Sequence, residues 1–169
     1  MISEKLFNEL NKQITYELFS AHFYLAMAAY AASEDLPGFE NFFKVQAEEE
    51  KFHAMRFFDY INEMGGRVKL EALDTPENDF ESLRDVFEKG LDHEKFVTSR
   101  IYLLTDIATE EREHATISFL KWFIDEQVEE EANFSLILSK LKRVKEDSNG
   151  IYMIDAELAQ RVFTPPVIK

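Results

Sequence analysis

Apolar residues recur along most of the chain at alternating steps of three and four, which is the spacing of one face of an α-helix. The pattern predicts long helices at about residues 3–33, 37–64, 80–110 and 114–144, and a shorter one at about 155–163. Ser3 is a suitable N-cap for the first helix, and Pro37 suits the first turn of the second. Gly65-Gly66 ends the second helix, and Ser148-Asn149-Gly150 ends the fourth.

The connections between these helices predict how they are arranged. The first and second helices, and the third and fourth, are joined by short turns, so each pair is expected to form an antiparallel hairpin. The connection over residues 67–79 is long enough to run the length of a bundle. We therefore expect an all-α fold in a single domain over residues 1–169. It is a four-helix bundle, at about 3–145, with one long crossover and a short fifth C-terminal helix.

Each long apolar stripe is interrupted near its middle by side chains that bind metals. These residues are Glu17 in the first helix, Glu50 and His53 in the second, Glu94 in the third, and Gln127 and Glu130 in the fourth. One glutamate on an apolar face is more often a charge at the edge of the stripe. Four interruptions at matching depth are harder to explain, because a buried carboxylate costs several kcal/mol unless it is paired or bound to a cation. The stripes contain no Lys or Arg, so a bound cation cluster accounts for them better than a hydrogen-bonded core network.

The ligand types narrow the choice of metal. Glu50-x-x-His53 places a carboxylate and an imidazole on one helix face, and such pairs hold di-iron sites in bundle cores. Mixed oxygen and imidazole ligands suit iron or manganese. The fourth helix carries Gln127-x-x-Glu130 instead of a second Glu-x-x-His, which predicts two unequal metal positions. Three neighbouring acids form either a third cation site or an exposed acidic face; they are Glu49, Glu126 and Glu129.

Composition limits the function classes. The net charge is −14, which disfavours nucleic acid and anionic lipid as partners and concentrates cations, although it also serves plain solubility. The absence of cysteine excludes disulfides, thiolate zinc sites and iron–sulfur clusters, and fits a reducing compartment. No apolar run reaches the roughly 20 residues that span a bilayer, and the first residues lack the layout of a signal peptide. We expect a cytoplasmic protein.

The chain resembles the bacterial non-haem ferritins along essentially its whole length. The residues that carry the resemblance are Glu17 with Tyr24, the run Ala47-Glu48-Glu49-Glu50-Lys51-Phe52-His53-Ala54, Glu94, and the run Glu126-Gln127-Val128-Glu129-Glu130. The resemblance implies a ferritin-like four-helix bundle that stores iron and oxidises Fe²⁺ to Fe³⁺ with O₂ or H₂O₂. It also implies a hollow homo-oligomer of twenty-four subunits, with ferric mineral and often phosphate inside.

The resemblance also implies roles for individual residues. The first iron is expected at Glu17, Glu50 and His53, the second at Glu50, Glu94 and Glu130, and a third at Glu49, Glu126, Glu129 and Glu130. Gln127 corresponds to a residue that orients groups near the site. Tyr24 corresponds to a tyrosine that supplies an electron during oxidation. A second expected role for Tyr24, compatible with the first, is that of a core tyrosine that hydrogen-bonds a carboxylate.

Several alternatives stay open at this point. No haem is expected, because Lys51 stands where bacterioferritins carry a haem-ligating Met. The apolar residues Leu158, Val162 and Phe163 are expected to dock on other subunits, or to pack back on their own bundle. A passive shell subunit without an oxidase centre, and a di-iron oxidase of another substrate, are the competing functions.

Overall fold

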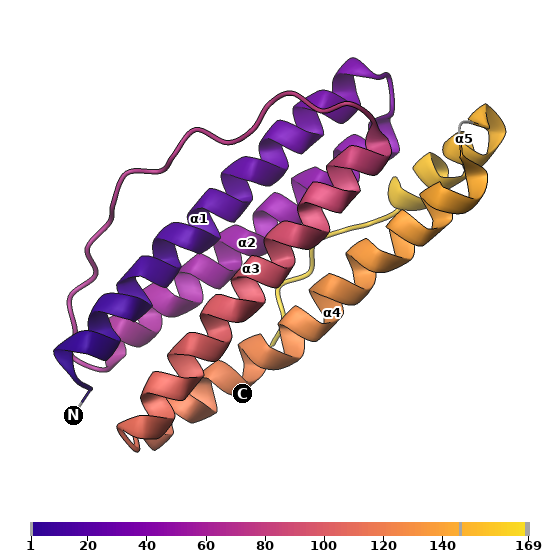
Figure 1. Cartoon of the computed structure of the whole chain (residues 1–169). Helices are drawn as coiled ribbons and strands as arrows, with labels where there is room; N and C mark the ends of the chain where they lie inside the picture. Colours follow the sequence, from indigo (N-terminus) through magenta and orange to yellow (C-terminus); the bar gives the residue numbers. More distant parts are fainter. Residues whose placement is uncertain (1, 146, 168–169) are drawn as a thin grey trace.

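The computed structural model describes residues 2–145 and 147–167, and over these residues it is an all-α bundle without strands (Figure 1). The helices are α1 (Glu4–Ser33), α2 (Pro37–Glu63), α3 (Leu83–Glu110), α4 (His114–Val144) and α5 (Ser148–Leu158). The predicted fold class, a four-helix bundle with a short fifth helix, is confirmed. None of the helices in the described ranges is both long and apolar enough to cross a membrane.

Side-chain caps explain where the helices begin. The Ser3 hydroxyl accepts a hydrogen bond from the Leu6 amide at 3.0 Å, which satisfies one of the unpaired donors at the start of α1. Ser82 does the same for the Asp85 amide at 3.1 Å. This cap places the start of α3 at Leu83, slightly later than the apolar pattern predicts. Gly65 has a φ of +78°, the left-handed conformation that glycine adopts readily after a helix end.

The long crossover between α2 and α3 runs beside α1 for most of the length of the bundle (Figure 1). Asn11 of α1 holds its first part. The Asn11 side-chain oxygen accepts a hydrogen bond from the Lys69 amide at 2.7 Å, and its amide group donates to the Phe7 carbonyl at 3.0 Å. The crossover therefore makes α3 start at the end of the bundle where α1 finishes, as the predicted topology requires.

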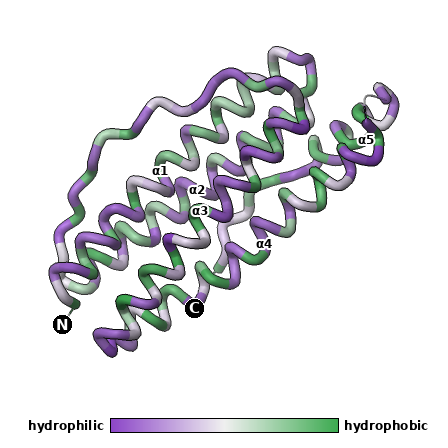
Figure 2. The backbone as a smooth tube through the Cα atoms, in the orientation of Figure 1, coloured by the Kyte–Doolittle hydropathy of each residue, from purple (hydrophilic) through white to green (hydrophobic). Residues whose placement is uncertain are grey.

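The buried core consists of two apolar clusters with a polar layer between them. One cluster includes Tyr24, Phe43 and Phe134 and lies toward the α5 end. The other includes Leu10 and Phe57 and lies toward the start of α1. Figure 2 shows the resulting alternation of hydrophobic and hydrophilic residues along each helix. The apolar clusters supply the rigid packing that holds the polar layer in place.

The predicted position of the fifth helix is wrong. The prediction was about 155–163, but α5 begins at Ser148 and ends at Leu158. The residues at 148–150 therefore start α5 and do not end α4. The reason is the Asp147 side chain, which accepts a hydrogen bond from the Gly150 amide at 2.8 Å and caps the new helix.

A buried aspartate joins α5 to the start of α2. Asp155 accepts hydrogen bonds from the Gly38 and Phe39 amides at 2.8 and 3.0 Å, so it caps a helix whose own N-cap residue makes no side-chain cap bond. A Cβ added to Gly38 would lie 1.7 Å from the Asp155 carbonyl oxygen, so this close approach requires glycine. Leu158 is buried in the core of its own bundle, whereas Val162 is exposed. Packing back on the same bundle is thus the correct alternative for Leu158.

Candidate metal centre

All of the chemically distinctive residues from the four stripes lie in the buried polar layer. Each is only 1–3% exposed; they are Glu17, Glu50, His53, Glu94, Gln127 and Glu130. The helices place them there because each residue continues the inward face of its own apolar stripe. The described residues of this layer include no buried lysine or arginine to balance the four carboxylates. Such a set of acids requires protons or bound cations.

The α1–α2 half of the layer forms the first ligand group. One ligand atom from each of Glu17, Glu50 and His53 lies within 4.8 Å of the others. His53 Nδ1 is 3.3 Å from Glu50 Oε2. Glu17 Oε1 accepts a hydrogen bond from Gln13 Nε2 at 2.9 Å, but the buried Glu17 Oε2 has no hydrogen-bond partner. An unpartnered buried carboxylate oxygen beside an imidazole and a second carboxylate suits a divalent cation with hard or borderline preferences.

The α3–α4 half holds its carboxylates by hydrogen bonds from neutral donors. Glu94 accepts from the Tyr24 hydroxyl and, at 3.1 Å, from Gln127 Nε2. Glu130 Oε2 accepts from Gln46 Nε2 at 2.6 Å. Tyr24 therefore bonds a carboxylate of the layer, which is one of its two expected roles. Gln127 orients Glu94 with its amide nitrogen.

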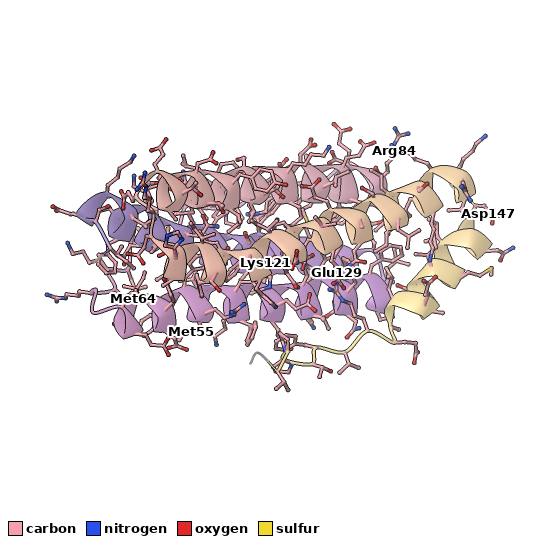
Figure 3. The ribbon with its side chains drawn as sticks, turned by 90° about the horizontal axis from the view of Figure 1, so that it is seen from below. Met55, Met64, Arg84, Lys121, Glu129 and Asp147 are labelled. Atoms are coloured by element: carbon pink, nitrogen blue, oxygen red, sulfur yellow. The ribbon has the colours of Figure 1, made fainter. Side chains whose placement is uncertain are left out.

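The three acids expected at a third site have different surroundings. Half-buried Glu126 forms a second possible ligand group with His53 and Glu130, and its Oε1 lies 3.8 Å from His53 Nε2. Glu49 is paired with Arg161 at 2.5 Å. Glu129 is exposed on α4 and is labelled in Figure 3. The structure thus brings Glu126 to the buried layer and gives Glu49 a cationic partner from the chain itself.

Burial shifts the pKa of every carboxyl group in the layer upward. The pKa of Glu94 rises to about 7 and that of Glu130 to about 8, in both cases mainly because burial disfavours the charge. The pKa of Glu17 is also raised by burial, and that of Glu50 is raised well above its ordinary value by burial and by Glu94. For His53, burial opposes the charge, but the carboxylates of Glu126 and Glu50, which face its two ring nitrogens, and the charges of Glu50 and Glu17 raise its pKa well above its usual value.

The chain matches the family described as "Ferritin-like domain" over residues 7–144. It belongs to the ferritin family. A bacterial non-heme ferritin of Staphylococcus aureus (strain MRSA252) is 45% identical over 163 residues, which cover 96% of this chain and 98% of that protein.

The chain is also similar to solved ferritin structures, both in fold and in sequence. The open-pore ferritin from the hyperthermophilic archaeon Archaeoglobus fulgidus matches with a TM-score of 0.95 at 44% identity, covering 96% of this chain and 100% of that chain. A humanized archaeal ferritin matches with a TM-score of 0.97 at 44% identity, covering 98% and 100%.

The sequence analysis gave no site role to two buried glutamines of this ferritin centre, although Gln46 lies in the apolar stripe of the second helix. Gln13 bonds Glu17, and Gln46 bonds Glu130 and lies 3.5 Å from Glu50 Oε1. Each glutamine stands four residues before a glutamate, so the repeated spacing Gln-x-x-x-Glu on α1 and α2 was a usable signal. Arg161 was also missed. It lies far along the chain from Glu49, and no local pattern connects the two.

Proposed function

We propose that this ferritin stores iron and that its buried layer oxidises Fe²⁺ to Fe³⁺, with O₂ or H₂O₂ as the oxidant. One observation carries the proposal. The buried Glu17 oxygen that has no hydrogen-bond partner is placed to bind a cation together with Glu50 and His53. The ligand types suit iron, and the names of the similar proteins are those of ferritins.

In this proposal the first Fe²⁺ binds Glu17, Glu50 and His53. The second binds Glu94 and Glu130, with Glu50 shared between the two ions. Anionic oxygen ligands in a buried layer stabilise Fe³⁺ more than Fe²⁺, because the extra positive charge interacts with them at low dielectric. Each ion then gives up one electron. O₂ accepts two electrons and two protons to give H₂O₂, and the two Fe³⁺ ions hydrolyse and join the stored mineral.

Storage requires a closed assembly, and we propose the twenty-four-subunit shell for it. Large apolar side chains are exposed on the outer faces of several helices; they are Leu25 on α1, Tyr102 and Leu103 on α3, Val128 and Leu136 on α4, and Tyr152 and Met153 on α5. Exposed apolar side chains on several elements support contacts with further copies. The strongly acidic chain also favours the approach of Fe²⁺ over that of anions.

The test is anaerobic loading of the apo-protein with Fe²⁺, followed by mixing with O₂ and stopped-flow absorbance. We expect a fast phase that saturates at about two irons per subunit. Glu50→Ala and His53→Ala should slow that phase by at least about 100-fold, because each removes a direct ligand. Glu48→Ala is the matched control, since Glu48 is the exposed neighbour of Glu49 on the same helix.

Each competing function predicts a different result. Oxidation no faster than in protein-free buffer would contradict the ferroxidase proposal and leave a passive shell subunit. Fast oxidation by a monomer or dimer, measured by analytical ultracentrifugation, would instead indicate a di-iron oxidase that does not store iron.

A further inference from the structure

The chain after α5 turns back along α2 toward the middle of the bundle (Figures 1 and 3). We name residues 159–163 the C-terminal strap. The Asn41 amide group donates to the carbonyls of Leu158 and Arg161 at 3.1 and 2.9 Å, which anchors the strap at one end. At the other end, the Phe163 ring lies 6.0 Å from the Phe52 ring. The strap therefore passes directly over the part of α2 that carries the metal ligands.

Arg161 is the central residue of the strap, and its guanidinium group has several partners. Its Nη2 bonds Glu49 Oε2 at 2.5 Å, and its Nη1 donates to Gln46 Oε1 at 2.8 Å. The guanidinium carbon lies 4.4 Å from the centre of the Phe42 ring. Both side chains of the Arg161–Glu49 pair are only 21% exposed. Each contact uses the planar fork of arginine, so the group is held in one orientation.

Gln46 connects Arg161 to the metal layer. A guanidinium group only donates hydrogen bonds, so it fixes the oxygen of the Gln46 amide toward the strap. The amide nitrogen then faces inward, where it donates to Glu130 Oε2 at 2.6 Å. Arg161 thus acts on Glu130 through one intervening side chain, and on Glu49 directly.

We propose that Arg161 is a positioning residue that holds Glu49, one of the expected ligands of the third cation, as its internal counter-ion, and that a metal ion is bound by Glu49 only when the strap releases it. The proposal rests on the proposed function, because it concerns iron that moves to or from the paired site. Glu126 and Glu130 already lie within reach of a common ion, whereas Glu49 is neutralised by the strap. A cation beside Glu49 would be repelled by the guanidinium group, so the two charges compete for one carboxylate.

The first experiment titrates the assembled apo-protein with Zn²⁺, a redox-inert probe, by isothermal titration calorimetry. We expect two tighter equivalents and a weaker third in the wild type. In Arg161→Gln the third equivalent should bind at least about tenfold more tightly, because the competing charge is gone, while the first, at Glu17, Glu50 and His53, changes little. Arg161→Lys keeps the charge but loses the planar fork, so its third equivalent should bind with an affinity between those of the wild type and of Arg161→Gln.

The matched control is Lys140→Gln. Lys140 pairs with Glu157 of α5 at 2.6 Å, so this variant removes a cation that holds the same C-terminal region but leaves the Glu49 pair intact. Its third equivalent should bind as in the wild type. A tenfold gain in Lys140→Gln would mean that general loosening, and not the Arg161 charge, controls the site, and would overturn the proposal.

The second experiment measures hydrogen exchange of the strap by mass spectrometry during the same titration. In the wild type the amides of residues 159–163 should exchange faster only when the third equivalent binds. Glu49→Gln should raise their exchange without any metal and weaken the third equivalent, and adding Arg161→Gln to it should have no further effect. This cycle tests the pair even if Arg161→Gln alone is unstable.

The two proposals fail in different ways. If the third equivalent is unchanged or weaker in Arg161→Gln, or if the strap exchanges at the same rate throughout, the inference about Arg161 is wrong and the paired site is unaffected. If the wild type does not bind the first two equivalents, the proposed function and this inference both fall.

Discussion

The α1–α2 half of the buried layer differs from the α3–α4 half in what its carboxylates contact. In the first half, Glu17 has an oxygen without a hydrogen-bond partner, and Glu50 lies 3.3 Å from the His53 ring nitrogen. In the second half, Glu94 and Glu130 both accept hydrogen bonds from neutral side chains. A cation entering the first half meets ligand atoms that are already available. One entering the second half meets Glu94, whose two carboxylate oxygens both already accept hydrogen bonds.

Both halves of the layer also hold protons, because burial raises the pKa of Glu17 and Glu50 as well as that of Glu94 and Glu130. The pKa values of about 7 for Glu94 and about 8 for Glu130 mean that both groups hold protons for much of the time near neutral pH. A metal ion has to replace these protons before it binds. The positive charge of a first ion would lower the neighbouring carboxyl pKa values and so prepare the second position. Because the first half offers the unpartnered Glu17 oxygen, we expect sequential filling with the α1–α2 half first.

The largest effect is expected for Glu17→Gln. This change keeps the size of the side chain but removes the charge and the unpartnered oxygen of the first half. We expect the affinity for the first Fe²⁺ equivalent to fall by on the order of 100-fold, measured by anaerobic calorimetry. Binding of the first equivalent at wild-type affinity would mean that the α3–α4 half fills first.

A smaller and more selective effect is expected for Glu94→Gln. The first equivalent should bind as in the wild type, while the second should weaken by roughly 10–100-fold in the same titration. The reason is that Glu94 belongs to neither of the ligand groups that contain His53. Equal losses of affinity for both equivalents would show that the two halves act as one unit, and would contradict the difference described above.

The pH dependence should be about tenfold per pH unit for the second equivalent. If its binding releases one proton from Glu94 or Glu130, affinity rises between about pH 6 and 8 and levels off above the raised pKa of about 8. The first equivalent should also bind more tightly as the pH rises, because the pKa values of its ligands Glu17, Glu50 and His53 are raised as well. Calorimetry in buffers of different ionisation enthalpy measures the protons released, and no proton release with the second ion would contradict the assignment.

Glu94 and Glu130 also determine how the stability of the apo-protein depends on pH. Their pKa values in the folded protein lie above the ordinary value of 4.5, so the native state binds more protons than the unfolded chain between about pH 4.5 and 8. Their stabilising contribution is complete below about pH 4.5 and is lost as the pH rises through about 7 and 8. We expect the thermal midpoint of the apo-protein to fall from pH 6 to pH 8.5, and Zn²⁺ to reduce that fall. A thermal midpoint of the apo-protein that rises over this pH range would contradict the prediction.

The sequence predicts the four long helices well because their signals are local. Periodic apolar residues and a cap such as Ser3 lie within a few residues of the structure that they determine. The fifth helix was misplaced because a segment of Ser, Asn and Gly is typical of both helix ends and helix starts. Asp147 decides between them by capping Gly150. The contact of Asp155 with α2 depends on tertiary packing and has no local signal.

The candidate site also has one part that the sequence predicts and another that it does not. Carboxylates and a histidine inside apolar stripes are visible from the sequence, because each interrupts a regular pattern at the same depth. Their hydrogen-bond partners are harder to predict. Gln46 belongs to a stripe, but its bond to Glu130 depends on how α2 and α4 pack, and the Arg161–Glu49 pair joins segments that are far apart in the chain. The sequence thus predicts which residues form the site, but it does not predict the hydrogen bonds and ion pairs between segments that are far apart in the chain.

The smallest effect is expected for Tyr24→Phe, which tests whether hydrogen bonds from neutral side chains weaken metal binding in the α3–α4 half. The Tyr24 hydroxyl donates to Glu94, and burial together with Glu94 raises its pKa well above the ordinary value, so it stays protonated and keeps donating. Without it, the second equivalent should bind a few-fold more tightly, since one donor fewer has to be displaced, while the apo-protein loses about 1 kcal/mol of stability. Calorimetry and thermal unfolding measure the two changes. Stopped-flow oxidation of the same variant separates restraint from electron supply: a slower fast phase despite tighter binding would show that the tyrosine also takes part in the oxidation.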